Sequence, residues 1–135
     1  MAINHFKTSK ALLDRLKSLS GLPPLAQENS AYTPTVGQAY MREADMSGAT
    51  QAPTLGADGF QRQDGLYRVG VFVPKNNGKF NAIGYIDAII AGFSRGLALE
   101  YEGQKVRIEQ SEREQGFVDG EWFQAGVMIR YTVIA

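Results

Sequence analysis

The chain has 135 residues, with 14 Lys and Arg against 14 Asp and Glu, no cysteine and one histidine, His5. The missing cysteines exclude disulfide scaffolds, thiol nucleophiles and iron–sulfur sites, and one histidine cannot build a His-rich metal centre. A zero net charge argues against binding bulk nucleic acid through an overall basic field. We therefore expect a single domain over residues 1–135 with no bound metal and no cofactor.

Segments for export or membrane insertion are not expected. A secretory signal needs an uninterrupted apolar stretch, but Lys7, Lys10 and Asp14 already interrupt the first twenty residues. The most apolar later window, residues 82–93, contains Asp87 and is too short to span a bilayer. We expect a protein that is made and kept in the cytoplasm.

An amphipathic helix is predicted over residues 2–20, because apolar residues recur there at spacings of three and four. Its expected apolar stripe contains Ile3, Phe6, Leu12, Leu13, Leu16 and Leu19. Gly21 and the Pro23–Pro24 pair end the helix. Its other side has an excess of three cations, from Lys7, Lys10, Arg15 and Lys17 against Asp14. We interpret this basic side as solvated.

Residues 22–37 contain Pro23, Pro24 and Pro34 and are interpreted as an extended connection. A strand is predicted over Gln38–Met46. A long loop is predicted over residues 47–65, which contain four glycines and show little hydrophobic periodicity. Loops of this length are usually functional or flexible, so we expect this one to serve the protein's function.

The two strands with the clearest alternation are predicted over residues 66–74 and 122–134. Their expected core residues are Tyr67, Val69, Val71 and Val73 in the first strand and Phe123, Ala125, Val127, Ile129, Tyr131 and Val133 in the second. The opposite faces mix Phe72 and Met128 with Arg68 and Arg130. We therefore expect a helix or a partner subunit to cover that second face.

A second helix is predicted over residues 79–94, and its expected buried stripe contains Ala82, Ile86, Ile89 and Phe93. Gly84 and Gly92 are expected to permit close packing on the sheet. A hairpin follows, with strands over residues 97–101 and 105–110 and a turn at Glu102–Gly103. Residues 111–120 are interpreted as a polar connection to the last strand.

The predicted order is helix, strand, strand, helix and three strands. This order favours an α+β fold with a single mixed, mainly antiparallel sheet flanked by two helices.

The residues that could support catalysis are few, and the chain is predicted not to be an enzyme. The turn Asn76–Lys79 lies between a strand and a helix, where an anion could bind, but it has too little glycine for a phosphate loop. Phe80 also follows Lys79 where such a loop needs Ser or Thr. Glu112 and Glu114 are interpreted as solvated acids, and His5 as a surface or packing residue.

Arginines near aromatic residues allow two interpretations. Arg42, Arg62, Arg68 and Arg130 lie near Tyr40, Phe60, Tyr67 and Tyr131 in the sequence. Basic and aromatic side chains together can bind single-stranded nucleic acid. Because acids are interleaved throughout, packing or a protein–protein contact is the favoured interpretation.

Several short motifs, taken in order, resemble one family over nearly the whole chain. They are Ala26-x-Glu28-Asn29, Tyr32-x-Pro34, Gly37-x-x-Tyr40-x-Arg42, Thr54-Leu55-Gly56, Arg62-x-x-Gly65-x-Tyr67-x-Val69-x-Val71-x-x-Pro74, Asp119-Gly120-x-Trp122-Phe123 and Val127-x-Ile129-x-Tyr131. This order resembles the tail-terminator, or tail-completion, proteins of long-tailed bacteriophages, relatives of the terminator of phage lambda. Gln27 differs from the family pattern, which frequently has a tryptophan there.

The resemblance implies structural work rather than chemistry. Family members fold as a sheet with flanking helices and assemble into a six-fold ring on the head-proximal end of the tail tube. The implied partners are further copies of the chain, the tail tube protein and a head-completion or connector protein, with DNA only as passing cargo and no membrane. The implied location is the tail–neck junction of the virion, after assembly in the host cytoplasm.

A ring of identical copies needs two different surfaces on each copy. The candidate subunit or tube interface contains Arg42, Leu55, Phe60, Arg62, Arg68, Phe72, Met128 and Arg130. Two alternatives stay open: another head–tail connector or neck adaptor, and a small ligand-binding domain or enzyme that uses the turn at residues 74–79.

The balanced charge is uneven along the chain. Residues 100–121 contain seven acids and only Lys105, Arg107 and Arg113 as cations, whereas the first helix is basic. Two unlike patches of this kind would suit a head-to-tail assembly.

Overall fold

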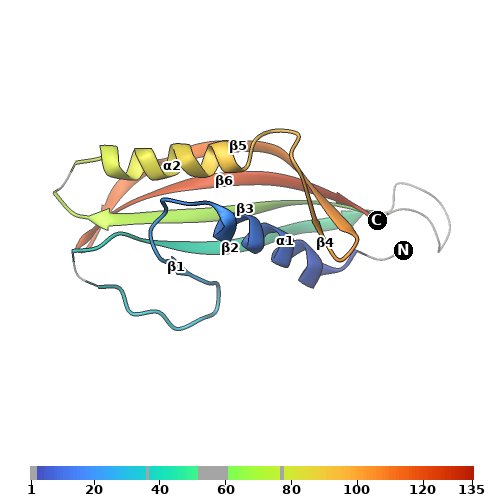
Figure 1. Ribbon diagram of the computed structural model, residues 1–135, viewed down its shortest axis with the longest axis horizontal. Coiled ribbons are helices and arrows are strands. Elements are labelled where there is room, and N and C mark those ends of the chain that lie inside the picture. Colours follow the sequence, from blue (N-terminus) through green and yellow to red (C-terminus); the bar gives the residue numbers. More distant parts are fainter. Residues whose placement is uncertain (1–2, 36, 52–60, 77) are drawn as a thin grey trace.

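The computed structural model describes residues 3–35, 37–51, 61–76 and 78–135 (Figure 1). Helix α1 (His5–Ser18) precedes three strands, β1 (Leu25–Ala26), β2 (Tyr40–Gln51) and β3 (Arg62–Pro74). Helix α2 (Phe80–Gly92) follows, and then β4 (Ala98–Tyr101), β5 (Gln104–Asp119) and β6 (Trp122–Ile134). The fold is α+β, with two helices and one six-stranded sheet. Neither of these described helices is long and apolar enough to cross a membrane.

The strands lie in the order β1-β2-β3-β6-β5-β4. β1 pairs with β2 in parallel, and the other neighbouring pairs are antiparallel. The long strands run side by side in a mixed, curled sheet (Figure 1). The predicted order of elements is wrong because it lacks β1, which lies inside the predicted connection 22–37 and, at two residues, is too short to show any alternation.

Two stretches predicted as loops belong largely to strands. β2 and β3 extend into residues 47–65, where Ser47 pairs with Gly65 and Gln51 with Arg62; residues 52–60 lie outside the described part of the chain. β5 continues through most of the predicted connection 111–120 and ends at Asp119. Backbone pairing needs no apolar side chains, and none of residues 109–119 is buried. Hydrophobic alternation therefore gives no signal there.

Both helices are shorter than the predicted ranges 2–20 and 79–94. α1 begins after Asn4, whose Oδ1 accepts a hydrogen bond from the Lys7 N–H at 3.0 Å. Gln104 of β5 holds the same turn: its Nε2 donates to the Asn4 carbonyl at 2.7 Å and to the Thr8 hydroxyl at 2.6 Å. Its Oε1 accepts from the Asn4 N–H at 2.8 Å. One side chain thus fixes the start of α1 to the sheet.

The predicted turn at Glu102–Gly103 is confirmed. Both residues have positive φ, +47° and +88°, as a two-residue type I′ hairpin turn requires. The turn joins β4 to the first residues of β5, where Tyr101 pairs with Gln104.

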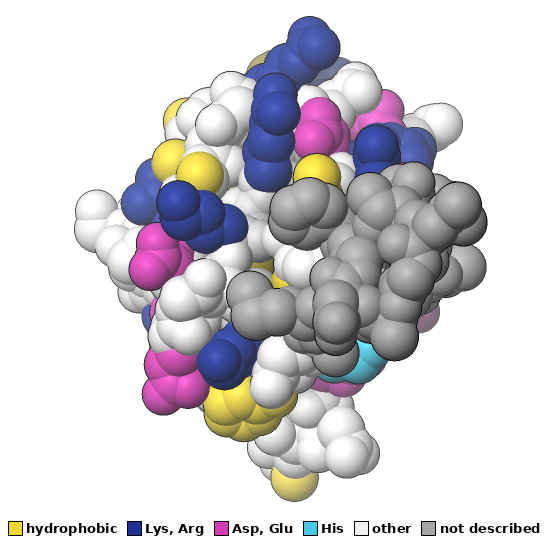
Figure 2. All heavy atoms as spheres, turned by 90° about the vertical axis from the view of Figure 1, so that its right-hand side faces the viewer, with side chains coloured by type: hydrophobic (Ala, Val, Ile, Leu, Met, Phe, Trp, Pro, Cys, Tyr) yellow, Lys and Arg dark blue, Asp and Glu magenta, His cyan; other side chains and the backbone are white. Residues whose placement is uncertain are grey.

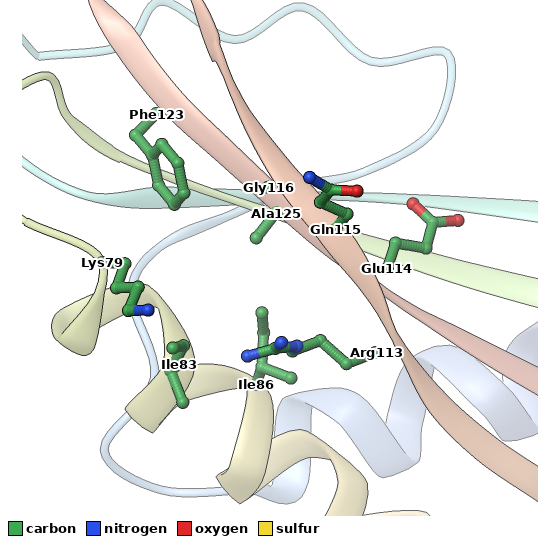
Figure 3. A pocket seen from close by; sticks show the side chains of 9 residues that line it. All are labelled: Lys79, Ile83, Ile86, Arg113, Glu114, Gln115, Gly116, Phe123 and Ala125. Atoms are coloured by element: carbon green, nitrogen blue, oxygen red, sulfur yellow. The ribbon is translucent and has the colours of Figure 1, made fainter.

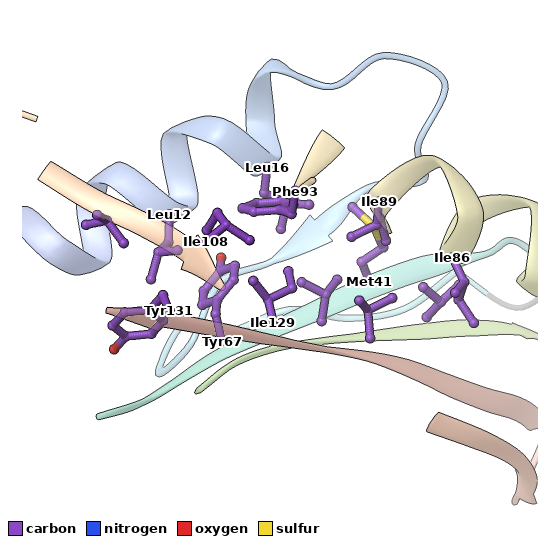
Figure 4. Packing of buried hydrophobic residues seen from close by; sticks show 14 of the residues in the cluster. Leu12, Leu16, Met41, Tyr67, Ile86, Ile89, Phe93, Ile108, Ile129 and Tyr131 are labelled. Carbon is purple, nitrogen blue, oxygen red and sulfur yellow. The ribbon is translucent and has the colours of Figure 1, made fainter. Parts of the chain in front are cut away.

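Both helices cover one face of the sheet, and the core lies between them and the strands (Figure 4). The predicted core residues of β3, β6 and α2 are buried, except Phe123, which is partly buried against the same cluster. The predicted stripe of α1 is partly wrong, because Phe6 is 66% exposed. Thr8, Ala11, Leu12 and Leu16 form the buried row, and Phe6 packs edge-on against Tyr101 instead.

The prediction that Gly84 and Gly92 permit close packing of α2 on the sheet is wrong for both glycines. A Cβ on Gly84 would meet nothing within 4 Å, so that residue is not needed for close packing. A Cβ on Gly92 would lie 2.5 Å from the δ carbons of Leu19. Gly92 therefore permits a close approach of α2 to the end of α1, not to the sheet.

Tyr131 crosses a strand on the core face. It pairs with Gly65 of β3, and a Cβ on Gly65 would lie 2.4 Å from the Tyr131 ring carbon Cζ. The Tyr131 hydroxyl continues to β2, where it donates to Asp45 Oδ1 at 2.6 Å. The missing side chain at Gly65 thus lets β6 contact β2 across β3.

Candidate protein interface on the uncovered sheet face

The face of the sheet opposite the helices is called the open face here. Because successive side chains alternate along a strand, the even-numbered residues of β3 and β6, and those of β2 as far as Met46, lie on it. Six of the predicted interface residues share this face: Arg42, Arg62, Arg68, Phe72, Met128 and Arg130. The other two, Leu55 and Phe60, lie outside the described residues.

An aromatic cluster occupies one end of the open face. Tyr40 stacks on Phe72 with ring centroids 4.6 Å apart, and Trp122 packs edge-on against Tyr40 at 5.0 Å. Tyr32, from the segment before β2, stacks on the other side of Tyr40 at 5.4 Å, which leaves Tyr40 only 5% exposed. The Arg42 guanidinium lies 5.5 Å from the Tyr40 ring centroid, close enough for a cation–π contact.

A long ion pair crosses the middle of the open face. The Arg68 side chain runs from β3 across Gly126 of β6 to Glu114 of β5, with 2.9 Å between Arg68 Nη2 and Glu114 Oε2. A Cβ on Gly126 would lie 2.7 Å from that carboxylate and 3.0 Å from the guanidinium. Gly70, paired with Gly126, borders the same Arg68 side chain. Because these two glycines have no side chains, the Arg68 side chain can lie directly over the backbone of β3 and β6.

The other arginines of the open face are also partnered. Arg130 pairs with Glu112 at 3.2 Å, and Arg62 with Asp64 at 3.3 Å. Glu112 and Glu114 are therefore ion-pair partners that stay partly solvated, with side chains 43% and 31% exposed. With its guanidinium groups paired or stacked, this face suits a protein contact better than a phosphate backbone.

The turn before α2 has the geometry of a connection between elements. Asn76 and Gly78 have φ of +72° and +78°, and Lys79 caps α2 without a side-chain hydrogen bond to the helix. Asn77 lies outside the described residues. The Lys79 Nζ lies 5.7 Å from the Phe80 ring centroid. Among the described residues, no group of three His, Cys, Asp or Glu could hold a metal ion.

Figure 2 shows the end of the molecule that faces right in Figure 1. Basic, acidic and hydrophobic side chains are interspersed over the described part of this end. The uneven charge of the sequence therefore does not gather into one patch in that view. Beside the two edges of the sheet, other charged residues line two grooves, with acids between α1 and β2 and cations between α2 and β5.

Sequence reasoning found the arginines of the open face but missed most of their partners. Tyr32 and Trp122 were not included in the interface, although both complete the aromatic cluster. The sequence contains one pattern that could have predicted these partners. Glu112 and Glu114 are two residues apart, so they lie on one face of a strand, and Arg68 and Arg130 lie on the matching face of β3 and β6. That signal becomes readable only once β5 is known to be a strand next to β6.

Comparison with known proteins gives one family. The model of a family described as "Phage tail terminator protein" matches residues 7–131. Comparison with curated proteins finds no match. One solved structure superposes with a TM-score of 0.78 at 22% sequence identity, covering 98% of this chain and 96% of that chain. At that identity the likeness shows a shared fold alone.

Proposed function

Since the chain belongs to the phage tail terminator protein family, we propose that it caps the head-proximal end of a phage tail tube as a ring. In that position the ring ends tube polymerisation and provides the surface on which head and tail join. The family consists of structural, non-enzymatic phage tail proteins, which makes the chain a virion component.

The family match over residues 7–131 is the observation that carries this proposal. The two unlike faces of the sheet support it, because one copy in a ring must contact both its neighbours and another protein. We assign the open face, with its aromatic cluster and paired arginines, to the contact with another virion protein. Large aromatic side chains and arginine are enriched at such contacts.

The proposed partners follow from this position. Six copies form the ring, the tail tube protein lies on one side, and a head-completion or connector protein lies on the other. DNA passes through without specific binding, since Arg62, Arg68 and Arg130 of the open face are already paired with carboxylates.

The decisive experiment is disruption of the gene in its phage, with electron microscopy of the lysate. Abnormally long or unjoined tails support a terminator. Free tails of normal length contradict it and indicate a head–tail connector instead. Purified wild-type protein added to tails from the mutant should restore their normal ends.

The open face is tested with Met128→Glu, which places a charge at its centre. The folded monomer should persist, because Met128 is only partly buried, while binding to tail tubes should be lost. Ala88→Glu is the matched control, since Ala88 is an exposed residue of α2 on the helix-covered side. Wild-type binding by Met128→Glu would show that the open face does not meet the tube.

A further inference from the structure

A basic groove lies beside the β5 edge of the sheet. It has a volume of about 550 Å³ and lies between the start of α2 and β5 (Figure 3). Lys79 and Arg113 reach into it from these two elements. Neither cation forms an ion pair with another described residue, whereas Glu114, which also lines the groove, is held by Arg68. The groove therefore has an uncompensated positive charge.

An acidic groove of about 360 Å³ lies beside the opposite edge, between α1 and β2. Glu28, Glu43 and Asp45 line it. Their described hydrogen bonds come from neutral donors: Glu43 accepts from the Glu28 N–H at 3.1 Å, Glu28 from the Asp45 N–H at 3.2 Å, and Asp45 from the Tyr131 and Ser9 hydroxyls. Lys10 also lines the groove, but it pairs with Asp14 at 3.4 Å.

The buried Tyr67 hydroxyl responds to this negative charge. Burial raises the pKa of Tyr67 above its usual range, and the nearby carboxylates of Glu43, Asp45 and Glu28 raise it further. The three carboxylates therefore lie close to one buried phenol, and none of them forms an ion pair with another described residue.

Both grooves adjoin stretches of strand edge that stay uncovered within the described chain. β1 pairs only with Met41 and Arg42 of β2, and beyond them no described strand pairs with this edge, although the Glu28 side chain accepts from the Asp45 N–H. β4 pairs with residues 104–107 of β5, and Gly96 and Leu97 bond the backbone of Ile108, so that β5 has no described strand beside this edge after Ile108. Exposed apolar side chains accompany each edge: Phe6 on the acidic side, and Phe80 and Val118 on the basic side.

We propose that the basic groove of one copy docks against the acidic groove of the next copy. The proposal rests on the ring proposed above and says which surfaces join its subunits. Because the grooves lie at opposite edges of one sheet, the contact is heterologous and repeats from copy to copy, as a ring requires. Opposite charge sets which edges meet, and the flanking apolar residues supply contact area. The open face then stays free for another virion protein.

Two charge-reversed variants test the pairing. The first, Lys79→Glu with Arg113→Glu, makes both edges acidic, and the second, Glu28→Lys with Glu43→Lys, makes both edges basic. Each variant alone should lose self-assembly, whether the wild type assembles in solution or only on tail tubes. An equimolar mixture should assemble again, because acidic and basic copies can alternate around an even-numbered ring. Mass measurement and electron microscopy report the result.

Lys17→Glu with Lys105→Glu is the matched control, because it changes the charge equally at exposed positions outside both grooves. It should assemble like the wild type. Circular dichroism checks that every variant is folded. A reversal that does not fold is replaced by the neutral variant of the same groove, Lys79→Gln with Arg113→Gln or Glu28→Gln with Glu43→Gln. Either neutral variant should weaken assembly at least tenfold.

The outcomes separate the two proposals. Assembly of either folded reversal at the wild-type level, or failure of the folded mixture to assemble, overturns the pairing of edges and leaves the ring untouched. A wild-type chain that neither closes into rings in solution nor binds tail tubes overturns the proposed function itself.

Discussion

Gly65 and Gly126 each leave room for a long side chain to cross a strand, one on each face of the sheet. Tyr131 passes Gly65 and bonds Asp45, whereas Arg68 passes Gly126 and bonds Glu114. The two crossings differ in how easily they can move. Tyr131 is 1% exposed and packed in the core, but the Arg68 and Glu114 ends are about 30% exposed and flexible. A methyl group added at Gly65 should therefore lower the free energy of unfolding much more than one added at Gly126.

Gly65→Ala should lower the free energy of unfolding by about 2 to 3 kcal/mol, because overpacking a fixed ring forces the core to shift. Gly84→Ala is the matched control. Its Cβ meets nothing within 4 Å in the exposed middle of α2, so it should raise stability by about 0.5 to 1 kcal/mol. Urea unfolding measures both. Equal effects of the two substitutions would contradict the crossing at Gly65.

Tyr67 gives a prediction at high pH. Its pKa is raised in the folded protein by burial and nearby carboxylates, so the folded phenol stays protonated when the unfolded one ionises near pH 10. Its contribution to stability is full below that pH and is lost as pH rises above it, by about 1.4 kcal/mol per pH unit. The free energy of unfolding should therefore fall more steeply between about pH 9 and 11 in the wild type than in Tyr67→Phe. Parallel pH profiles would refute the assignment.

At the scale of elements, one side chain of β5 holds the start of α1 against the sheet. Gln104 is 8% exposed and makes three hydrogen bonds to the first turn of α1. Gln104→Ala should cost about 1 to 3 kcal/mol of unfolding free energy, because it removes the donor to the buried Thr8 hydroxyl and both bonds to the Asn4 backbone. The neighbouring exposed Lys105→Ala should change stability by less than about 0.5 kcal/mol. Faster amide exchange in α1 alone would trace the loss to this contact.

The predictability of each element follows from its burial. β3, β6 and α2 pack one apolar side into the core, so their alternation or helical spacing is visible in the sequence. The end of β5 and the strand ends beside residues 52–60 lack that pattern, and they were predicted as loops. The predicted buried stripe of α1 is wrong for a different reason. The apolar Phe6 contacts Tyr101 at the surface, while the polar Thr8 lies buried beside Gln104. At such positions, tertiary partners rather than the local sequence pattern determine which side chain is buried.

At the scale of the whole molecule, the docking of charged grooves predicts salt-sensitive assembly. The Debye length falls from about 10 Å at 0.1 M salt to about 3 Å at 1 M, which screens exposed charges on separate copies. The association constant of the wild type should therefore fall as sodium chloride rises over this range. Analytical ultracentrifugation, or binding to tail tubes, measures it. An association constant that holds steady or rises would mean that apolar contact dominates.

The candidate site was predictable only in part at this scale. Charge counts along the sequence indicated a basic first helix and an acidic segment over residues 100–121. In the folded chain, Glu112 and Glu114 of that segment are neutralised by Arg130 and Arg68. The acids of the acidic groove, which have no ion pair among the described residues, come from the region of β1 and β2. The cations of the basic groove, likewise without an ion pair among those residues, come from the start of α2 and from β5. Which charges stay free depends on strand pairing, which no one-dimensional count contains.

The two crossings have a consequence for how the sheet can misfold. Both depend on the alignment of β3 with β6, one from each face. A slip of two residues would place Gln63 or Tyr67 where Gly65 accommodates the Tyr131 ring, and would move Gly126 from beneath Arg68. A misaligned sheet therefore loses both contacts at once. The two glycines thus favour one register of the central strand pair, which matters for a chain whose outer strand edges we propose to meet other copies.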